Sequence, residues 1–369
     1  MKKLLSAALA LCMTLCLCAP AFAAQNSMDN FRRTAAYNNN FADVSASHWA
    51  APSVKTCYEY GLMTGSGGGK FTPGGTLTVA QALVMADRVH EIYATGGSTL
   101  QNGSPWYQPY VDYAIANGII RAGDFTNYNA AISRADMAYI FANALPVSAL
   151  PAINAVLSLP DVTAFTPHAD EIFLLYNAGV LTGNDSFGTF EPNDTISRAE
   201  AAAIISRVAI PSERRSVTLL EEFPYNNRSI VLALPAGTIE IPDNTGSSYI
   251  SDNAMAIIAN TTDSAFWGIS ITDIFTSDSI EGILFNGFLD QNILLTNIHT
   301  DIVYFGSIVA FRTTGTATSS YSIENFVCYN YIYGNTRITI MLTSSDNALL
   351  TNMADNLQVS GSTVSPKLS

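Results

Sequence analysis

The chain has 369 residues, of which 48% are hydrophobic and only 13% are charged. This composition predicts a folded protein of two to three domains and excludes a charge-driven disordered chain, a collagen-like chain and a disulfide-dense scaffold. Thirty acidic residues against 17 Lys and Arg give a formal net charge of −13. That charge argues against nucleic acid or an anionic membrane surface as the main partner.

The first 23 residues have the pattern of a secretory signal peptide. An apolar stretch follows two lysines, and Ala21 and Ala23 supply the small residues that a signal peptidase reads. We therefore expect export, with residues 1–23 removed and residues 24–40 leading into the folded part. No later stretch reaches the roughly 18 apolar residues that a spanning helix needs, so we expect no transmembrane segment after cleavage.

Three segments of similar pattern follow, at residues 41–96, 103–147 and 157–210. Each opens with apolar residues at i, i+3, i+4 spacing, which predicts a short helix. Each of these patterns then reaches a glycine, which we expect to end the helix in the left-handed conformation. The three glycines are Gly61, Gly118 and Gly179. This recurrence predicts three related helical repeats.

Each repeat continues into a second helix whose start resembles a capping box, a hydroxyl residue followed three positions later by an acid or amide. These pairs are Thr78 with Gln81, Ser133 with Asp136, and Ser197 with Glu200. The residue after the hydroxyl is Arg134 in the second repeat and Arg198 in the third, whereas the first repeat has Val79. Capping is therefore expected in all three repeats, and a cation in two.

Two further positions recur before the glycine. Twelve residues earlier stand Trp49 and Trp106, with Pro167 in the third repeat. A recurring tryptophan either wedges between helices in the core or offers a flat apolar face to a sugar ring, and both interpretations remain open. Eighteen residues earlier, Asp43 and Asp161 begin Asp-Val pairs in the first and third repeats. We expect their carboxylates to brace the local backbone.

Together these residues resemble the S-layer homology (SLH) domains of bacterial cell-surface proteins, over roughly residues 41–210. The motifs that carry the resemblance are Phe41-Ala42-Asp43-Val44, Trp49, Gly61-Leu62-Met63-Thr64-Gly65, Phe71-Thr72-Pro73 and Ser197-Arg198-Ala199-Glu200. The resemblance implies a compact, pseudo-threefold helical bundle. It also implies that the bundle anchors an exported protein to a secondary cell-wall polysaccharide linked to peptidoglycan, often one that ends in a pyruvylated amino sugar.

In that family the helix-start arginine and neighbouring groove residues hold the anionic sugar. Carried over to this sequence, the resemblance makes the candidate ligand-binding residues Arg134, Arg198, Trp49, Trp106, Gly65 and Gly183. An arginine at the first helical position is also expected to place its guanidinium beside the free N–H groups and positive end of the helix. Because Val79 carries no charge, we expect the first helix start to be structural and at most two grooves to bind an acidic ligand strongly.

Residues 212–369 have a different pattern, with short runs of Val, Ile, Thr and aromatic residues that predict a mostly antiparallel sheet. Helical spacing over residues 349–359 predicts a closing helix, so this region is expected to be an α+β domain. The pattern faintly resembles small domains of the PsbP and Mog1 type. The whole chain is thus predicted to be multidomain, with a helix-rich repeat region followed by an α+β domain.

The C-terminal region offers little chemistry. His299 is its only histidine, so a two-histidine zinc site is excluded within it, and no catalytic or metal-binding motif is present. We therefore expect no metal and no cofactor. A thiol nucleophile at Cys328 with His299 as base is one remaining catalytic candidate. A pair of acids suited to glycoside hydrolysis is another, because the sequence does not give the separation of carboxyl groups. The adjacent Glu221 and Glu222 are not expected to form such a pair, since successive strand residues point to opposite faces.

Three functions remain in play. The leading one is a noncatalytic protein of the cell wall or cell surface, in which the repeats bind wall polymer and the C-terminal domain is displayed. The second is a wall-anchored hydrolase that acts on a polysaccharide or a peptide. The third is a subunit that assembles with itself into an S-layer lattice.

Overall fold

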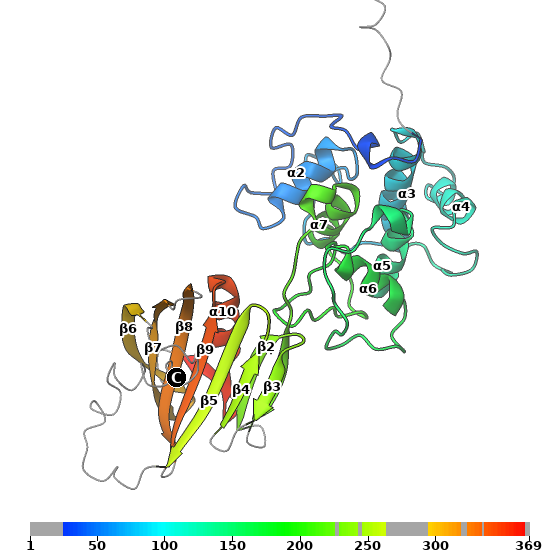
Figure 1. The fold of residues 1–369 in the computed structure, drawn as a ribbon. Helices are drawn as coiled ribbons and strands as arrows, with labels where there is room; N and C mark the ends of the chain where they lie inside the picture. Colours follow the sequence, from blue (N-terminus) through cyan, green and yellow to red (C-terminus); the bar gives the residue numbers. More distant parts are fainter. Residues whose placement is uncertain are drawn as a thin grey trace, which may run out of the picture. The chain divides into compact units, whose positions relative to one another are not determined.

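The computed structural model describes residues 25–225, 229–242, 246–262, 294–318, 323–333 and 336–365. The chain forms two compact units (Figure 1). The N-terminal unit comprises Met1–Gly183 and Thr189–Val217, and the C-terminal unit comprises Asn184–Gly188 and Thr218–Ser369. The expected signal peptide lies outside the described residues. Among the described helices, none is both long and apolar enough to cross a membrane.

The N-terminal unit is built from helices, and each of its three repeats contributes a short helix followed by a second helix. The elements are η1 Met28–Asn30, α2 Ala51–Glu59, α3 Val79–Thr95, α4 Gln108–Ala116, α5 Arg134–Ala142, η2 Val147–Ala149, α6 Ala169–Asn177, α7 Arg198–Ala209 and η3 Pro211–Glu213. The glycines that follow α2, α4 and α6 have φ values of 69°, 72° and 72°. They therefore adopt the left-handed conformation that the sequence predicted.

The second helices begin at caps of the expected kind. The Thr78 and Ser197 hydroxyls each accept a hydrogen bond from the N–H three residues on, and Gln81 and Glu200 reach back to complete the box. At α5 the Ser133 hydroxyl accepts from the Asp136 N–H and donates to the Asp136 carboxylate, but that carboxylate does not complete a box with the Ser133 N–H. Aspartate is one methylene shorter than glutamate, which accounts for the difference.

Antiparallel bridges join the segments that precede these helices. Thr78 pairs with Ala131, Ser133 with Thr195, and Thr76 with Ser197. The bridges connect the first repeat to the second, the second to the third, and the third back to the first. The residues between the bridges, Leu77, Ile132 and Ile196, are all fully buried. Each repeat therefore contacts both others at a shared apolar centre.

The C-terminal unit is an antiparallel sheet with one helix, as predicted. Its elements are β1 Leu220–Tyr225, β2 Ile230–Pro235, β3 Ile239–Pro242, β4 Gly246–Ile250, β5 Ala254–Thr262, β6 Leu294–Phe305, β7 Ile308–Thr318, β8 Ile323–Tyr333, β9 Thr336–Ser344, α10 Asn347–Asp355, β10 Gln358–Val359 and β11 Ser362–Ser365. The strand order is β1-β2-β10-β11-β6-β7-β8-β9-β5-β4-β3. Leu349, Leu350 and Met353 of α10 join the main apolar core of this unit.

Two boundaries differ from the sequence expectation. The closing helix ends at Asp355, because Val359 pairs with Ile230 of β2 and continues the sheet. The N-terminal unit extends to Val217, because the Arg215 N–H donates to the Gly179 carbonyl and the Val217 N–H to the Asn154 side chain, at 2.9 and 3.0 Å.

The proposed Cys328–His299 pair does not form. Across strands β6, β7 and β8, Cys328 aligns with Thr313, whereas His299 aligns with Thr314 and Val327. Because successive residues of a strand point to opposite faces of a sheet, the two side chains lie on opposite faces. Cys328 is moreover completely buried. This geometry excludes a thiol nucleophile with His299 as its base.

Candidate ligand-binding pocket

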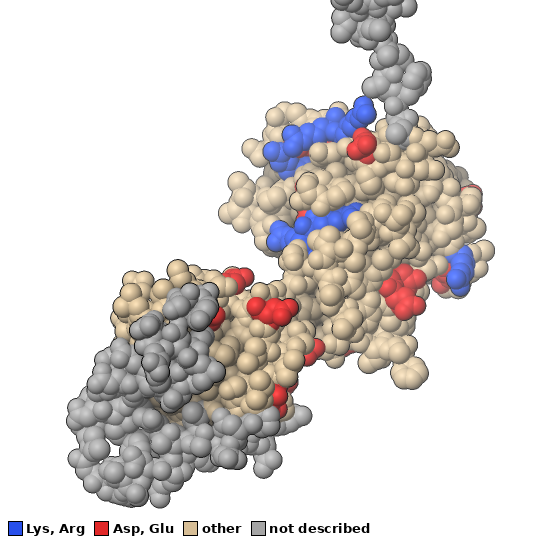
Figure 2. Space-filling model, viewed as in Figure 1, with Lys and Arg blue, Asp and Glu red and all other residues tan. Residues whose placement is uncertain are grey.

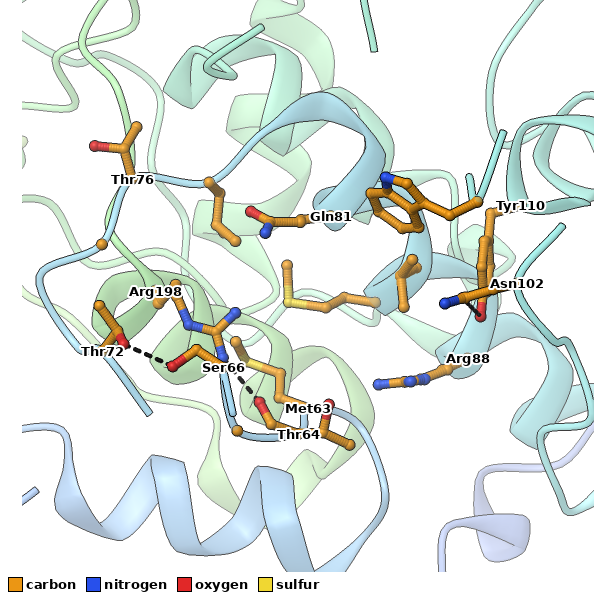
Figure 3. Close-up of a pocket in the computed structure, with 16 residues that line it drawn as sticks. Met63, Thr64, Ser66, Thr72, Thr76, Gln81, Arg88, Asn102, Tyr110 and Arg198 are labelled. Carbon is orange, nitrogen blue, oxygen red and sulfur yellow. Dashed lines mark hydrogen bonds between the residues drawn. The ribbon is translucent and has the colours of Figure 1, made fainter. Parts of the chain in front are cut away.

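The N-terminal unit contains a pocket of about 490 Å³ to which all three repeats contribute (Figure 3). The turn after α2 and the loop at residues 72–77 form one part, and one face of α3 forms another. Trp106 and Tyr110, at the start of α4, come from the second repeat, and Arg198, the first residue of α7, comes from the third. The pocket therefore depends on the packing of the repeats against one another.

Arg198 is held firmly at the wall of this pocket. Its Nε donates to the Phe71 carbonyl at 2.7 Å and its Nη2 to the Thr64 carbonyl at 2.8 Å, and its guanidinium carbon lies 4.7 Å from the centre of the Phe71 ring. Burial lowers the pKa of the guanidinium, and the nearby Asp43 carboxylate opposes that shift. Arg198 makes no ion pair with any residue that the structure describes. It is therefore an oriented cation that has the Asp43 carboxylate nearby but, among the described residues, no carboxylate in direct contact.

Asp43 and Asp161 hydrogen-bond to the two loops whose phenylalanines contact the helix-start arginines. Asp43 accepts hydrogen bonds from the Phe71 and Thr72 N–H groups, both at 2.8 Å, and the Phe71 bond is the main cause of its lowered pKa. Asp161 accepts in the same way from Phe190 and Glu191. The expected bracing of the local backbone is thus present in both repeats.

The helix start itself does not offer free N–H groups. The Arg198 N–H donates to the Gly75 carbonyl, the Ala199 N–H to the Pro73 carbonyl, and the Glu200 N–H to its capping serine. The expectation of free N–H donors beside the arginine is therefore wrong, because carbonyl groups of the loop at Pro73 and Gly75 accept their hydrogen bonds. The charge that an anion meets at this position comes from the arginine side chain.

One face of α3 supplies a second cation that the sequence analysis missed. Gln81, Met85 and Arg88 are spaced i, i+4 and i+7, and all three line the pocket. Arg88 donates to the Leu62 carbonyl at 3.4 Å, and burial lowers its pKa. The sequence signal for Arg88 is its i+7 position on the same helix face as Gln81. The first helix start thus carries an uncharged Val79, but the helix that begins there lines the pocket.

The tryptophans are both solvent-exposed, Trp49 by 63% and Trp106 by 38%, which argues against their being core wedges. Only Trp106 lines the pocket. Trp49 stacks on His48, with ring centres 5.8 Å apart. Gly65 also lines the pocket, and a Cβ at this position would lie 2.7 Å from both the Lys70 carbonyl and the Phe41 ring.

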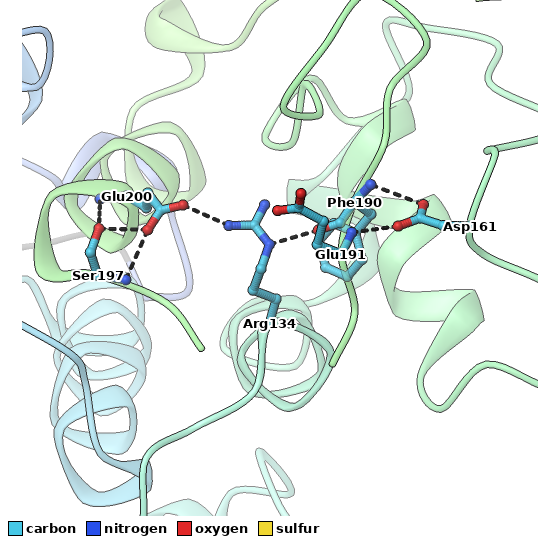
Figure 4. Close-up of polar contacts among 6 residues, drawn as sticks. All are labelled: Arg134, Asp161, Phe190, Glu191, Ser197 and Glu200. Carbon is cyan, nitrogen blue, oxygen red and sulfur yellow. Dashed lines mark hydrogen bonds and ion pairs between the residues drawn. The ribbon is translucent and has the colours of Figure 1, made fainter. Parts of the chain in front are cut away.

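Arg134 has the same backbone setting as Arg198 but different neighbours (Figure 4). Its Nε donates to the Phe190 carbonyl at 2.6 Å, and its Nη1 forms a 2.8 Å ion pair with Glu200. Arg134 is only 5% exposed. Gly183 belongs to the turn of the third repeat, with a φ of 78°. The structure therefore brings Arg198, Trp106 and Gly65 together and places Arg134, Trp49 and Gly183 outside this pocket.

The helix start of the first repeat has Val79 at the position where the other two repeats have Arg134 and Arg198. Val79 is buried, and its N–H donates to the Ala130 carbonyl, while the Ala80 N–H donates to the Tyr128 carbonyl. These bonds match those at the two arginine helix starts. By the same spacing, Thr126 stands where the loops that contact Arg198 and Arg134 have Phe71 and Phe190. His168 forms a 3.4 Å contact with Asp136 and stacks on a tyrosine ring. The expectation of at most two anion-binding grooves stays a prediction.

A family model for the S-layer homology domain matches residues 40–83 and 158–202. An S-layer protein of Bacillus thuringiensis subsp. finitimus is 27% identical over 177 residues, covering 47% of this chain and 22% of that protein. An endoglucanase of Bacillus sp. (strain KSM-635) is also 27% identical, over 223 residues that cover 56% of this chain and 22% of the enzyme. The chain thus spans about a fifth of the length of these relatives.

Among solved structures, cyanobacterial PsbP from Synechocystis sp. PCC 6803 matches with a TM-score of 0.29 and 12% identity. The match covers 39% of this chain and 94% of that protein. At this TM-score it supports no conclusion about the C-terminal unit.

Proposed function

Because this chain is a secreted cell-surface protein that carries S-layer homology domains, we propose that its N-terminal unit anchors it to the cell wall by binding an acidic secondary cell-wall polysaccharide. The acidic group is a carboxylate, such as that of a pyruvylated amino sugar. The role is noncatalytic, and the C-terminal unit is displayed from the anchor. The second repeat, at residues 103–147, is part of the same pseudo-threefold bundle, which the ring of bridges between the three helix starts supports.

The observation that carries this proposal is that one pocket is lined both by the Arg198 guanidinium, which forms no ion pair with a described residue, and by the partly exposed Trp106. A guanidinium binds a carboxylate through charge-assisted hydrogen bonds, and an indole face packs against a sugar ring. Two carbonyls and the Phe71 ring already fix Arg198, so little side-chain entropy is lost when a ligand binds. Arg88 adds positive charge to the same pocket.

The distribution of charge favours the N-terminal unit as the part that meets an acidic polymer. On the face drawn in Figure 2, the N-terminal unit shows both basic and acidic side chains, whereas the described part of the C-terminal unit shows acidic ones and no Lys or Arg. The alternative of a wall-anchored hydrolase gains no support from Glu221 and Glu222, since they are successive residues of β1 and point to opposite faces. An enzyme relative and an S-layer relative both match this chain, so similarity alone does not choose between these functions.

The test is cosedimentation of the full exported chain with cell walls, before and after hydrofluoric acid removes their secondary polymer. The unaltered protein is expected to pellet with untreated walls only. Arg198→Ala is expected to weaken binding about tenfold or more, because a hydrogen bond to a charged group contributes about 1.5–3 kcal/mol. Trp106→Ala is expected to weaken it several-fold.

Two matched controls come from the chain itself. Trp49→Ala removes an exposed tryptophan at the corresponding position of the first repeat, outside the pocket. Arg207→Ala removes an arginine of the third repeat that matches Arg88 but does not line the pocket. Arg207 donates to the Val180 carbonyl and Arg88 to the Leu62 carbonyl, and each of these carbonyls belongs to the residue after a helix-ending glycine. Both controls are expected to bind as the unaltered protein does. Full binding by the Arg198→Ala protein, or equal binding to stripped walls, would refute the anchor pocket.

A further inference from the structure

Arg134 and Arg198 occupy equivalent positions in the backbone. The Arg198 N–H donates to the Gly75 carbonyl and the Arg134 N–H to the Asp194 carbonyl, both at 2.8 Å. Each Nε then donates to the carbonyl of a phenylalanine, and each guanidinium lies over that phenylalanine's ring. Arg134 is therefore a second arginine of the kind that lines the pocket, set one repeat further round the unit.

The two arginines differ in the side chain that faces them from the neighbouring helix start. In the pocket that holds Arg198, the third residue of α3 is the neutral Gln81. Arg134 instead meets Glu200, the third residue of α7, through Oε1 at 2.8 Å, while Oε2 of the same carboxylate accepts the capping bond from the Ser197 N–H (Figure 4). A carboxylate of the protein thus already occupies the place that a ligand carboxylate would need.

The surrounding loop strengthens this contrast. Where the first repeat has Thr72 and Gly75, the third has Glu191 and Asp194, as the matching hydrogen bonds to the two arginines establish. An acidic ligand that approaches Arg134 would meet like charge and would have to displace the Glu200 ion pair. Juxtaposed like charges weaken binding at an interface. The Arg134 guanidinium is therefore not available to bind an acidic ligand.

We propose that Glu200 is an internal carboxylate that closes a second anion-binding site at Arg134, so that the chain binds one acidic sugar and not two. This inference rests on the proposed function of the Arg198 pocket. It makes the residue at the third position of each second helix, Gln81 or Glu200, the determinant of whether the adjoining arginine accepts a ligand. Exchanging carboxylate for amide at that position opens a site, and the reverse exchange closes one.

The experiment is isothermal titration of the full exported chain with the methyl glycoside of an amino sugar that carries a pyruvate ketal. The sugar without the ketal is the control. The unaltered protein is expected to bind one equivalent, and Glu200→Gln two. Gln81→Glu is expected to weaken the single site about tenfold or more, because it sets a like charge against the ligand. Both variants keep their caps, since Gln81 and Glu200 each complete a capping box at their own helix.

The outcomes separate the two proposals. One equivalent bound by both the unaltered protein and folded Glu200→Gln overturns the internal-carboxylate proposal and leaves the Arg198 pocket intact. Two equivalents bound by the unaltered protein also overturn it, because the second site is then already open. No binding by the unaltered protein but one equivalent by Glu200→Gln overturns the Arg198 pocket and supports the role of Glu200. If neither protein binds, both proposals fail.

Discussion

At the scale of single residues, the carboxyl group of Asp87 in α3 is the least compensated group in the N-terminal unit. It is fully buried, and neither of its oxygens has a hydrogen-bond partner among the described residues. Burial, and to a lesser extent the neighbouring Glu91 carboxylate, raises its pKa to about 8. Asp87 is therefore largely protonated in the folded protein at neutral pH, whereas it ionises near pH 3.8 when exposed.

This difference predicts that Asp87 weakens folding as the pH rises. Below about pH 4 both states are protonated and the residue contributes no pH dependence; between about pH 4 and 8 the unfolded state alone loses its proton, and stability falls by about 1.4 kcal/mol per pH unit. Asp87→Asn removes this titration. Its stability advantage over the unaltered protein is therefore expected to grow from pH 4 to pH 8 in urea unfolding. Asp112→Asn, at an exposed acid of α4, is the control, and a gap that stays constant with pH would contradict the prediction.

The cysteines give a second prediction at this scale. Neither Cys57 nor Cys328 forms a disulfide, and both are buried. The Cys57 thiol donates to the Ala202 carbonyl at 3.3 Å. Burial raises the pKa of the Cys57 thiol, and only the thiolate is a good nucleophile. Neither thiol in the exported chain is expected to react with a thiol-specific dye until denaturant is added. Rapid labelling of the native protein would show that one of them is accessible.

At the scale of elements, the loop that carries Phe71 links stability to binding. Asp43 holds the loop through two N–H groups, and the loop in turn presents the carbonyl and ring that orient Arg198. Asp43→Ala is therefore expected to cost about 1 kcal/mol of stability and also to weaken wall binding. Asp161→Ala removes the same brace beneath Arg134, so it should cost similar stability and leave binding unchanged. Equal effects of the two variants on binding would refute the link, and urea unfolding with cosedimentation measures both quantities.

Local patterns predicted the elements well, because capping residues, helix-ending glycines and alternating strand residues act within a few positions of one another. They did not predict which arginine would be neutralised. Glu200 is 66 residues from Arg134, and the two meet only because one repeat packs against the next. The sheet order has the same origin, since β10 lies between β2 and β11 although β2 precedes it by more than a hundred residues.

At the scale of the whole molecule, the third repeat contributes to both units. Asn184–Gly188, within its turn, belongs to the C-terminal unit, where the Leu220 N–H donates to the Ser186 carbonyl at 2.9 Å and Phe187 packs against the main core. The division of function between anchor and displayed domain therefore does not coincide with a single cut in the sequence.

Phe187→Ala is accordingly expected to destabilise the C-terminal unit. Losing part of a phenylalanine contact costs about 1–2 kcal/mol, so the amides of β2 should exchange with deuterium about tenfold faster, while those of α3 keep their rates. Phe165→Ala is the matched control, since this phenylalanine of the same repeat is 97% exposed. Faster exchange in α3 and not in β2 would show that the turn belongs to the N-terminal unit, contrary to this assignment.

The bridge between Thr76 and Ser197 gives the proposed anchor a mechanical property. It ties the last repeat, from which the chain leaves at Val217, directly to the first. A pull on the displayed unit therefore reaches the third repeat while that repeat is still fastened to both of its neighbours. We therefore expect the bridges at the common centre to share the load, so that the repeats do not detach one by one under tension. A wall protein exposed to shear gains resistance to detachment from a ring that it would not gain from a linear array.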